Sequence, residues 1–321
     1  MRYIFLDTES ANCFDNVYKL CEIGYVITDE KLNLLPGAAD ALINPGKGRD
    51  CRFYLKGRKN GRDLILAHPY EKYFASPTFD FFYDNLKFLL TQKDVKVFFW
   101  AGENDIQAIE DNCARYRLPL ISFLSYDVQI LLKRIAQLKQ VSKLEKTLED
   151  LGVDLSGITA HRPDEDARMT MMLLKVLCEK EGNDVETLLK KYPECQRDSI
   201  PAYEGMKKRH EEKMERRRIA EEEKERLKPY NDALNAIYAQ EIEEDYPFEK
   251  RFSISLNMKR HLDETLSPVQ EWLSRGYRTL RGLGVKYLVC YDEEEVNLLK
   301  EKLDTSNLII LTKEEFEKVV Q

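Results

Sequence analysis

The chain has 321 residues, of which 33% are charged and 43% are apolar, and its formal net charge is −7. This length is enough for two domains with buried cores, and the composition is that of a globular protein. The negative charge excludes a basic field over the whole molecule, so any contact with nucleic acid must come from local patches.

Cysteine usage and the first residues indicate the compartment. Seven cysteines without a Cys-x-x-Cys pair fit reduced thiols and argue against a zinc site. Only four apolar residues directly precede Asp7, too few for a signal peptide, and no apolar run is as long as a membrane span. We therefore expect a cytoplasmic protein.

The first part of the chain alternates between strand and helix patterns. The predicted strands are residues 2–7, 21–29, either 32–35 or 41–44, 95–100 and 123–127. The predicted helices, in which apolar residues recur at helical spacing, are residues 79–90, 103–116, 128–138, 143–151 and 164–179. This order predicts an α/β fold with a mixed five-stranded sheet flanked by helices.

A highly charged segment follows. Residues 205–228 contain ten Lys or Arg and seven Glu, and Glu212/Arg216 and Glu222/Arg226 are pairs at favourable helical spacing. We predict a long solvated helix. A coiled coil is disfavoured because the apolar residues keep no heptad. A nucleic-acid clamp through Arg216, Arg217 and Arg218 is the alternative, but the interleaved glutamates favour the solvated helix.

The last residues are predicted to form a small α/β module. Its predicted strands are residues 287–290 and 308–311, and its predicted helices are residues 293–303 and 312–319. Thr312 and Glu315 form a capping-box pattern at the start of the last helix. These elements faintly resemble the later part of a BRCT domain, with a generic α/β module as the alternative. We therefore expect three parts: residues 1–182, a charged helical linker at 183–250, and the module at 251–321.

Two acids mark the first strand. Asp7 and Glu9 follow the apolar run of residues 3–6, and residues two apart on a strand point to the same side. Charge beside a buried strand needs a neutralising cation, and a divalent metal would supply it. A strand end that enters a solvated loop would explain the same pattern. The choice between a metal site and such a loop depends on whether the chain contains further candidate ligands.

Three later residues are candidate partners. Asp105 follows the predicted strand 95–100, at the start of a helix. His161 lies on the loop before the helix at 164–179, and Asp166 lies in its first turn. A lone histidine is more often structural than catalytic, so His161 taken by itself does not indicate a catalytic role.

In this order, the motifs resemble the DEDDh group of 3′–5′ exonucleases, within the ribonuclease H-like superfamily. This group includes RNase T and the proofreading subunit of bacterial DNA polymerase III. The segment Cys21-Glu22-Ile23-Gly24-Tyr25 resembles the second strand of the group, and Ser76-Pro77-Thr78-Phe79 resembles the start of its first helix. The resemblance covers residues 2 to about 180.

The resemblance implies a two-metal phosphodiester hydrolase. Asp7, Glu9, Asp105 and Asp166 would hold two Mg²⁺ or Mn²⁺ ions, which prefer oxygen ligands. His161 would act as the general base, a role that suits histidine near neutral pH. Ser10 stands where the group usually has Thr beside the nucleic acid, and Asn104 replaces an aromatic residue before the third acid. Neither departure removes a metal ligand.

A basic segment is the candidate nucleic-acid contact. Residues 47–62 contain seven Lys or Arg and one acid, with two aromatic residues interleaved. Cations for phosphates and aromatic rings for bases suit single-stranded nucleic acid. The residues proposed for this contact are Arg52, Phe53, Tyr54, Lys56, Arg58 and Lys59. A solvated loop without such a role is the alternative.

The sequence therefore predicts a metal-dependent 3′–5′ exonuclease that acts on single-stranded 3′ ends of DNA or RNA. A nucleic-acid-binding or scaffold protein on an inactive exonuclease fold is the alternative. The five catalytic positions argue for the enzyme, because an inactive site would tolerate their loss. The C-terminal module is a candidate surface for a protein partner.

Overall fold

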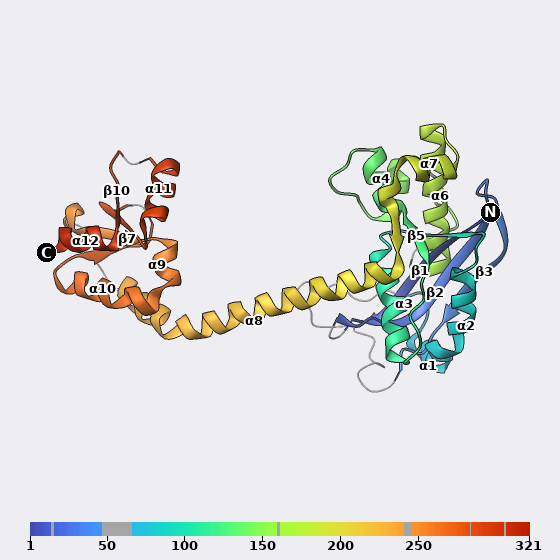
Figure 1. Cartoon of the computed structure of the whole chain (residues 1–321), viewed down its shortest axis with the longest axis horizontal. Helices are drawn as coiled ribbons and strands as arrows, with labels where there is room; N and C mark the ends of the chain where they lie inside the picture. The colour runs from blue at the N-terminus through green and yellow to red at the C-terminus, as the bar shows by residue number, and fades with distance from the viewer. Residues whose placement is uncertain (14–15, 47–65, 159–160, 241–245, 283, 305) are drawn as a thin grey trace. The chain divides into compact units, whose positions relative to one another are not determined.

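The computed structural model describes residues 1–13, 16–46, 66–158, 161–240, 246–282, 284–304 and 306–321 (Figure 1). These residues form two compact units, Met1–Glu211 and Glu212–Gln321. Among the described helices, none has the length and apolar character needed to cross a membrane.

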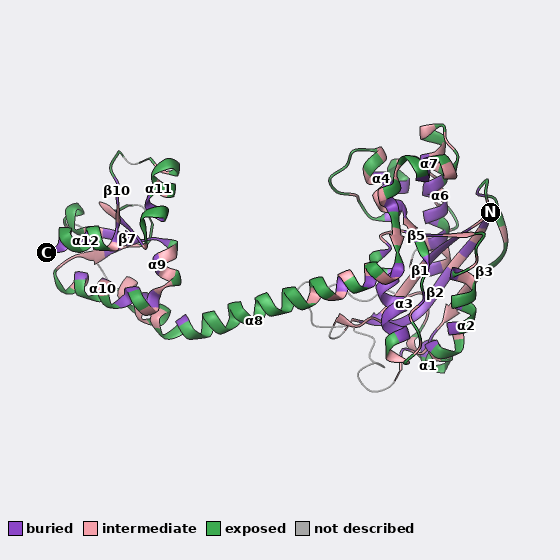
Figure 2. Cartoon of the chain, viewed as in Figure 1, coloured by how far each residue is buried: buried purple, intermediate pink, exposed green. Residues whose placement is uncertain are grey.

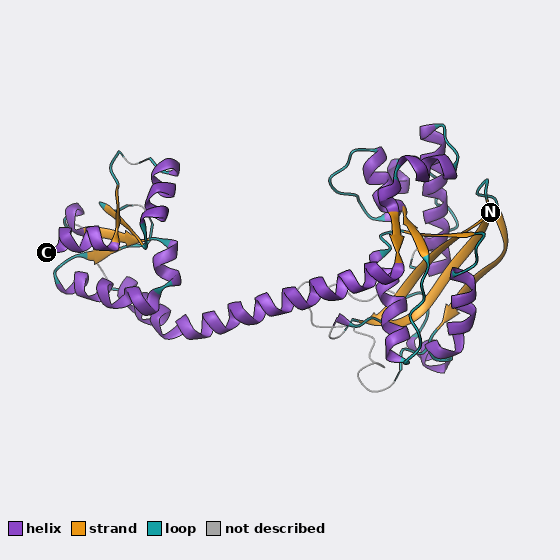
Figure 3. Cartoon of the chain, viewed as in Figure 1, coloured by secondary structure: helices purple, strands orange, loops and turns teal. Residues whose placement is uncertain are grey.

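The first unit contains a mixed sheet flanked by helices (Figure 3). Its strands are β1 Arg2–Asn12, β2 Lys19–Asp29, β3 Leu34–Leu42, β4 Val95–Phe99, β5 Leu124–Asp127 and β6 Gln196–Asp198. The order in the sheet is β3-β2-β1-β4-β5-β6, with β2, β3 and β6 antiparallel to their neighbours and β1, β4 and β5 mutually parallel. The predicted α/β class and mixed sheet are confirmed.

Three details of the sheet differ from the sequence prediction. Strand β1 continues to Asn12 instead of ending at Asp7, because its pairing with β2 extends to Asn12 opposite Lys19. Strand β3, Leu34–Leu42, overlaps the end of one alternative for the third strand, residues 32–35, and the start of the other, residues 41–44. The sixth strand, β6, was not predicted, since Gln196-Arg197-Asp198 has no apolar alternation.

Helices cover both faces of this sheet. They are α1 Tyr70–Ala75, α2 Phe79–Leu90, α3 Glu103–Arg115, α4 Val128–Ile135, α5 Leu144–Asp150, α6 Pro163–Glu181, α7 Val185–Lys191 and α8 Ser199–Tyr238. Successive side chains of β1 point to opposite faces of the sheet and therefore belong to two different hydrophobic cores. Tyr3 and Phe5 pack with α4 to α7, whereas Ile4 and Leu6 pack with α2, α3 and the start of α8. Because side chains alternate along a strand, those of Asp7 and Glu9 lie on the same face of the sheet as those of Tyr3 and Phe5.

Helix α8 is the predicted charged helix. Its residues 211–226 are all exposed, as the solvated-helix interpretation requires (Figure 2). The predicted pair Glu212/Arg216 is present at 3.6 Å. The predicted pair Glu222/Arg226 is wrong: Glu222 pairs with Arg218, and Arg226 pairs with Asp263.

The second unit is an α/β module with a parallel sheet in its described residues. Its strands are β7 Arg251–Ile254, β8 Arg278–Thr279, β9 Tyr287–Cys290 and β10 Ile309–Thr312, in the order β10-β9-β7-β8. Its helices are α9 Leu256–Arg260, α10 Leu262–Ser274, α11 Glu293–Lys302 and α12 Lys313–Val320. The predicted capping box at Thr312 and Glu315 is present. The core surrounds Phe252, Trp272 and Phe316 and includes Leu227 and Leu234 from α8.

A buried carboxyl in α3 makes the stability of the first unit depend on pH. Glu110 has no exposed surface, and its Oε2 atom accepts the Ile121 N–H at 3.1 Å, while Oε1 has no partner among the described residues. Burial raises the pKa of Glu110 to about 7. The unfolded chain therefore releases this proton at a lower pH than the folded chain, so the free energy of unfolding falls as pH rises from about 4.5 to about 7.

We expect Glu110→Gln to remove this contribution. At pH 8 the variant should unfold with a free energy about 2 kcal/mol higher than wild type, and the difference should shrink toward pH 4. Urea titrations at both pH values measure it. Glu149→Gln, on the exposed side of α5, is the control and should show no such change with pH. Equal differences at the two pH values would contradict the prediction.

Candidate metal centre

Strand β1 presents two carboxylates on one face of the sheet. Asp7 and Glu9 alternate with Tyr3 and Phe5, whose side chains are buried on the same face. Asp7 lies opposite Gly24 of β2, and Glu9 lies opposite Glu22. The acids therefore lie within a paired strand, which holds their backbone more firmly than a loop would.

Gly24 lets helix α6 approach this face. A Cβ atom added to Gly24 would lie 2.0 Å from the Asp164 nitrogen and 2.2 Å from the Pro163 carbonyl carbon. Both are backbone atoms, so they cannot move aside as a side chain would. The start of α6 thus contacts the backbone of β2 next to Asp7, and this contact brings Asp166 to the acids of β1.

We expect Gly24→Ala to displace the start of α6. The substitution should lower the free energy of unfolding by about 3 kcal/mol and reduce the affinity for Mn²⁺, because Asp166 would leave the other acids. Chemical denaturation and Mn²⁺ titration measure these effects. Gly284→Ala is the matched control, since a Cβ there meets no atom within 4 Å. If Gly24→Ala bound Mn²⁺ as tightly as wild type, close packing at Gly24 would not be required to position Asp166.

Helix α3 brings the third acid. The Oδ1 atom of Asp105 accepts the Thr8 N–H at 3.0 Å and the Thr8 hydroxyl at 2.8 Å. Gly102 starts the helix, and its N–H donates to Asp127 Oδ2 at 3.1 Å. Asp127 also accepts the Ile130 N–H at the start of α4. These bonds hold Asp105 next to β1.

Thr8 and Asp127 were not singled out from the sequence. A signal existed for Asp127, which stands between a predicted strand and a predicted helix, where an N-cap is common. Nothing local indicated that its second carboxylate oxygen would bond to Gly102, because that contact depends on the pairing of β4 with β5.

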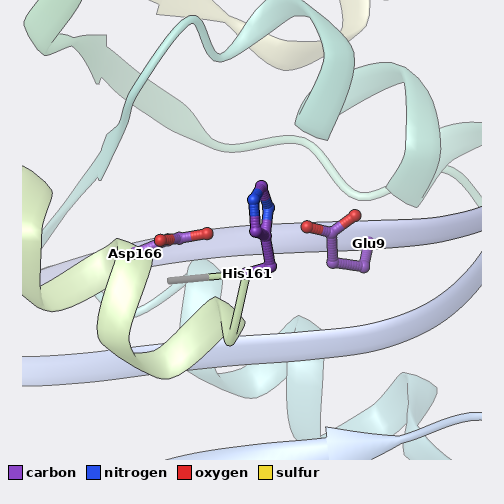
Figure 4. Close-up of side chains that lie close together, drawn as sticks. All are labelled: Glu9, His161 and Asp166. Atoms are coloured by element: carbon purple, nitrogen blue, oxygen red, sulfur yellow. The ribbon is translucent and has the colours of Figure 1, made fainter. Parts of the chain in front are cut away.

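His161 and Asp166 come from the start of α6. His161 has a positive φ of 62°, a conformation uncommon outside glycine, and Pro163 occupies the first position of the helix. The ligand atoms of Glu9, His161 and Asp166 lie within 4.8 Å of one another. Figure 4 shows the imidazole of His161 between the carboxylates of Glu9 and Asp166. The structure thus brings together a carboxylate of β1 and the His-x4-Asp motif.

A cleft of about 200 Å³ opens at this cluster. It is lined by Asp7, Trp100, Lys143, Leu144, Glu145, His161, Asp166 and Met169. Trp100, Lys143 and Glu145 were not foreseen, because their place beside the acids depends on how β4 and α5 pack against α6. The cleft gives a small ligand access to Asp7, His161 and Asp166.

Burial and neighbouring charges raise the pKa of all four acids. The pKa of Asp7 is raised well above its usual range, first by burial and then by the charge of Asp105. Burial, followed by Asp166, raises the pKa of Glu9 to about 8. The pKa values of Asp105 and Asp166 rise to about 7, also chiefly by burial, although the Thr8 hydrogen bonds oppose the rise at Asp105.

The four acids fit a centre for divalent cations. Among the described residues, no Lys or Arg forms an ion pair with Asp7, Glu9, Asp105 or Asp166, although Lys143 lines the cleft. Asp105 is buried, and Asp7, Glu9 and Asp166 are half-buried. Carboxylates shielded from water without a counter-ion are costly, and hard oxygen ligands suit Mg²⁺ and Mn²⁺. The donor set therefore matches the cations that the sequence predicts.

Of the residues predicted to contact nucleic acid, the structure describes only Ser10. Ser10 lies on β1 next to Glu9, where the register with β2 shifts, and it is partly exposed. The other predicted contacts lie outside the described residues: Arg52, Phe53, Tyr54, Lys56, Arg58 and Lys59. Their role stays a prediction from sequence.

Neither a family model nor a curated protein matches the chain. Among solved structures, E. coli exonuclease I in complex with a dA16 oligonucleotide is 14% identical with a TM-score of 0.48, and the match covers 59% of this chain and 42% of exonuclease I. A 3′-exonuclease described for 3′-end-specific recognition of a histone mRNA stem-loop is 14% identical with a TM-score of 0.43, over 57% of this chain and 83% of that chain. The chain thus spans less than half the length of exonuclease I, and at these values the likeness assigns no function.

Proposed function

We propose that the chain is a metal-dependent 3′–5′ exonuclease that hydrolyses phosphodiester bonds of nucleic acid. The observation that carries the proposal is the convergence of Glu9, His161 and Asp166, whose ligand atoms lie within 4.8 Å of one another at the cleft that Asp7 also lines. Carboxylates that no described Lys or Arg pairs with, next to an imidazole, are suited to metal-assisted hydrolysis.

Each residue has a proposed role. Asp7, Glu9, Asp105 and Asp166 would hold two Mg²⁺ or Mn²⁺ ions, directly or through water. When bound, such ions neutralise the charge on a phosphodiester and increase the acidity of a water molecule. Asp127 and Thr8 would keep Asp105 in place through the hydrogen bonds that they make.

His161 would act as the general base. Its imidazole lies beside Glu9 and Asp166, at the cleft where the substrate would enter. The imidazole would take a proton from the attacking water as the water oxygen bonds to phosphorus. The bond from phosphorus to the 3′-oxygen of the preceding nucleotide would break, and this oxygen would take a proton from solvent to become the new 3′-hydroxyl. A nucleoside 5′-monophosphate would be released.

The alternative proposal is a nucleic-acid-binding or scaffold protein with an inactive site. Burial, and then the charges of Asp105 and Asp166, raise the pKa of Asp7 and Glu9, and shielding such carboxylates from water costs stability. This cost is offset in an enzyme, where the acids would hold the catalytic cations. The cluster therefore favours the enzyme.

The substrate would be a single-stranded 3′ end. The basic segment at residues 47–62 would contact its phosphates and bases. We further propose the three-part organisation predicted from sequence, with residues 1–182 as the catalytic part, residues 183–250 as a linker and residues 251–321 as a module that binds a protein partner. The ends of this linker also pack with the parts they join: α7 and β6 with the first unit, and Leu227 and Leu234 with the core of the second.

A direct assay tests the proposed activity. Matched single-stranded DNA, single-stranded RNA and duplexes, each labelled at the 5′ end, are incubated with Mg²⁺ or Mn²⁺. We expect progressive shortening from the 3′ end of at least one single-stranded substrate, and none after chelation of the metal. Intact substrates with both metals would rule the exonuclease out.

A further inference from the structure

A second group of metal-ligating side chains lies one strand farther out on the same face of the sheet. Glu22 of β2, Asp40 of β3 and His68, which precedes α1, have ligand atoms within 4.8 Å of one another. In the sheet, Glu22 lies opposite Glu9, and Asp40 lies opposite Gly24. The group is therefore adjacent to the candidate metal centre but shares no residue with it.

Two carboxylate oxygens in this group have no donor. Glu22 has no exposed surface, and its Oε2 atom accepts a hydrogen bond from the Tyr73 hydroxyl at 2.5 Å. Its Oε1 atom, like Oδ1 of Asp40, is buried and has no hydrogen-bond partner among the described residues. Two carboxylates in contact need a shared proton or a shared cation, because neither can donate when ionised.

The geometry of His68 is compatible with a shared cation. Its Nε2 atom lies 3.7 Å from Asp40 Oδ2, which is too long for a hydrogen bond. Two ligands that each lie about 2.1 Å from one ion are separated by at most about 4.2 Å, so 3.7 Å is compatible with a shared ion.

The Lys and Arg side chains that the structure describes do not neutralise this group. Arg162 contributes a distant charge to the region, but its guanidinium bonds to Asp164 at 2.8 and 3.1 Å. No other described Lys or Arg forms an ion pair with Glu22 or Asp40. In the part of the chain that the structure describes, the three ligands thus face one another without a Lys or Arg side chain in contact.

We propose that Glu22, Asp40 and His68 bind one divalent transition-metal ion of the Zn²⁺ class, separately from the candidate metal centre. An imidazole and two carboxylates suit Zn²⁺, whereas Mg²⁺ prefers oxygen ligands alone. The cysteine pattern argued against a zinc site, but this site uses no thiolate. The Tyr73 hydroxyl orients the Glu22 carboxylate, as residues behind a metal ligand commonly do.

The ion would join three segments far apart in the sequence. It would tie the residues before α1 to the outer strands β2 and β3. It would also offset the charge of Glu22, which raises the pKa of Asp7. The proposed role is structural support beside the centre, and it holds whether or not the chain is a nuclease.

Histidine NMR tests the site in the full chain. The chain contains four histidines, so ¹⁵N-histidine labelling gives few ring signals, and His68→Ala identifies those of His68. Zn²⁺ is titrated into the chelator-treated variant His161→Ala/Asp166→Asn, in which the candidate metal centre is disrupted. We expect one equivalent of Zn²⁺ to shift the His68 ring-nitrogen signals. Unshifted His68 signals would overturn the proposal and indicate a shared proton between Glu22 and Asp40.

Calorimetry in the same background gives a second measurement. His68→Ala and Asp40→Asn should each weaken the tightest Zn²⁺ binding by at least about tenfold, because each removes a ligand. His210→Ala is the matched control, since it removes a histidine on α8 away from both groups, and it should leave the titration unchanged. Unchanged Zn²⁺ affinity in both His68→Ala and Asp40→Asn would overturn the proposal. Circular dichroism verifies that each variant is folded.

Discussion

Asp7→Asn or Asp166→Asn is expected to reduce 3′–5′ exonuclease activity by about 10³-fold or more. Each change removes a charged ligand from the proposed metal centre, where bound cations contribute several kcal/mol to the transition state. The rate of shortening of a 5′-labelled oligonucleotide measures the loss, and Mn²⁺ titration should show weaker binding in the same variants.

The same variants should not be less stable than wild type. Asp7 is one of four mutually repelling acids, and an amide removes one charge at nearly constant shape. Without divalent metal, the melting temperature of Asp7→Asn should therefore equal or exceed that of wild type. Asp84→Asn, on the exposed side of α2, is the control and should keep full activity. Activity within threefold of wild type in Asp7→Asn would contradict the proposed centre.

His161→Ala is expected to lower kcat by about 10²- to 10⁴-fold, the usual contribution of a general base. A base transfers a proton but does not hold the cation, so Mn²⁺ affinity should stay within about threefold of wild type. Added imidazole should restore part of the activity, because it can replace the missing ring in the cleft. His210→Ala should behave as wild type.

The position of His161 makes this test decisive between two roles. Its ring lies close enough to Glu9 and Asp166 to share an ion with them. If His161 were a ligand instead of the base, His161→Ala would weaken Mn²⁺ binding strongly, and imidazole would restore binding together with activity. That outcome would retain the metal centre and reassign the histidine.

Local patterns were sufficient for much of the fold. The helix predicted at 79–90 is α2 Phe79–Leu90, and the capping box at Thr312 forms as predicted. Helical spacing and capping involve residues within a few positions of each other, so neighbouring residues alone specify them. The common side of Asp7 and Glu9 follows equally from the two-residue period of a strand.

Pairing between strands determined the extent of β1 and the presence of β6, which local sequence patterns did not predict. Strand β1 extends past its apolar run because β2 pairs with it to Asn12. The polar strand β6 exists because β5 offers an edge to it. In both cases the hydrogen bonds come from a partner strand, which the segment's own residues do not reveal.

The candidate site likewise has features that local sequence predicts and features that only tertiary packing determines. The sequence by itself determined which acids and which histidine are candidates, because their spacing along β1 and at the start of α6 is local. Only the tertiary structure decided that Gly24 admits the backbone of α6, that Asp127 supports Gly102, and that Glu22, Asp40 and His68 form a second group. These arrangements depend on close packing between elements distant in the chain, and no local period encodes that packing.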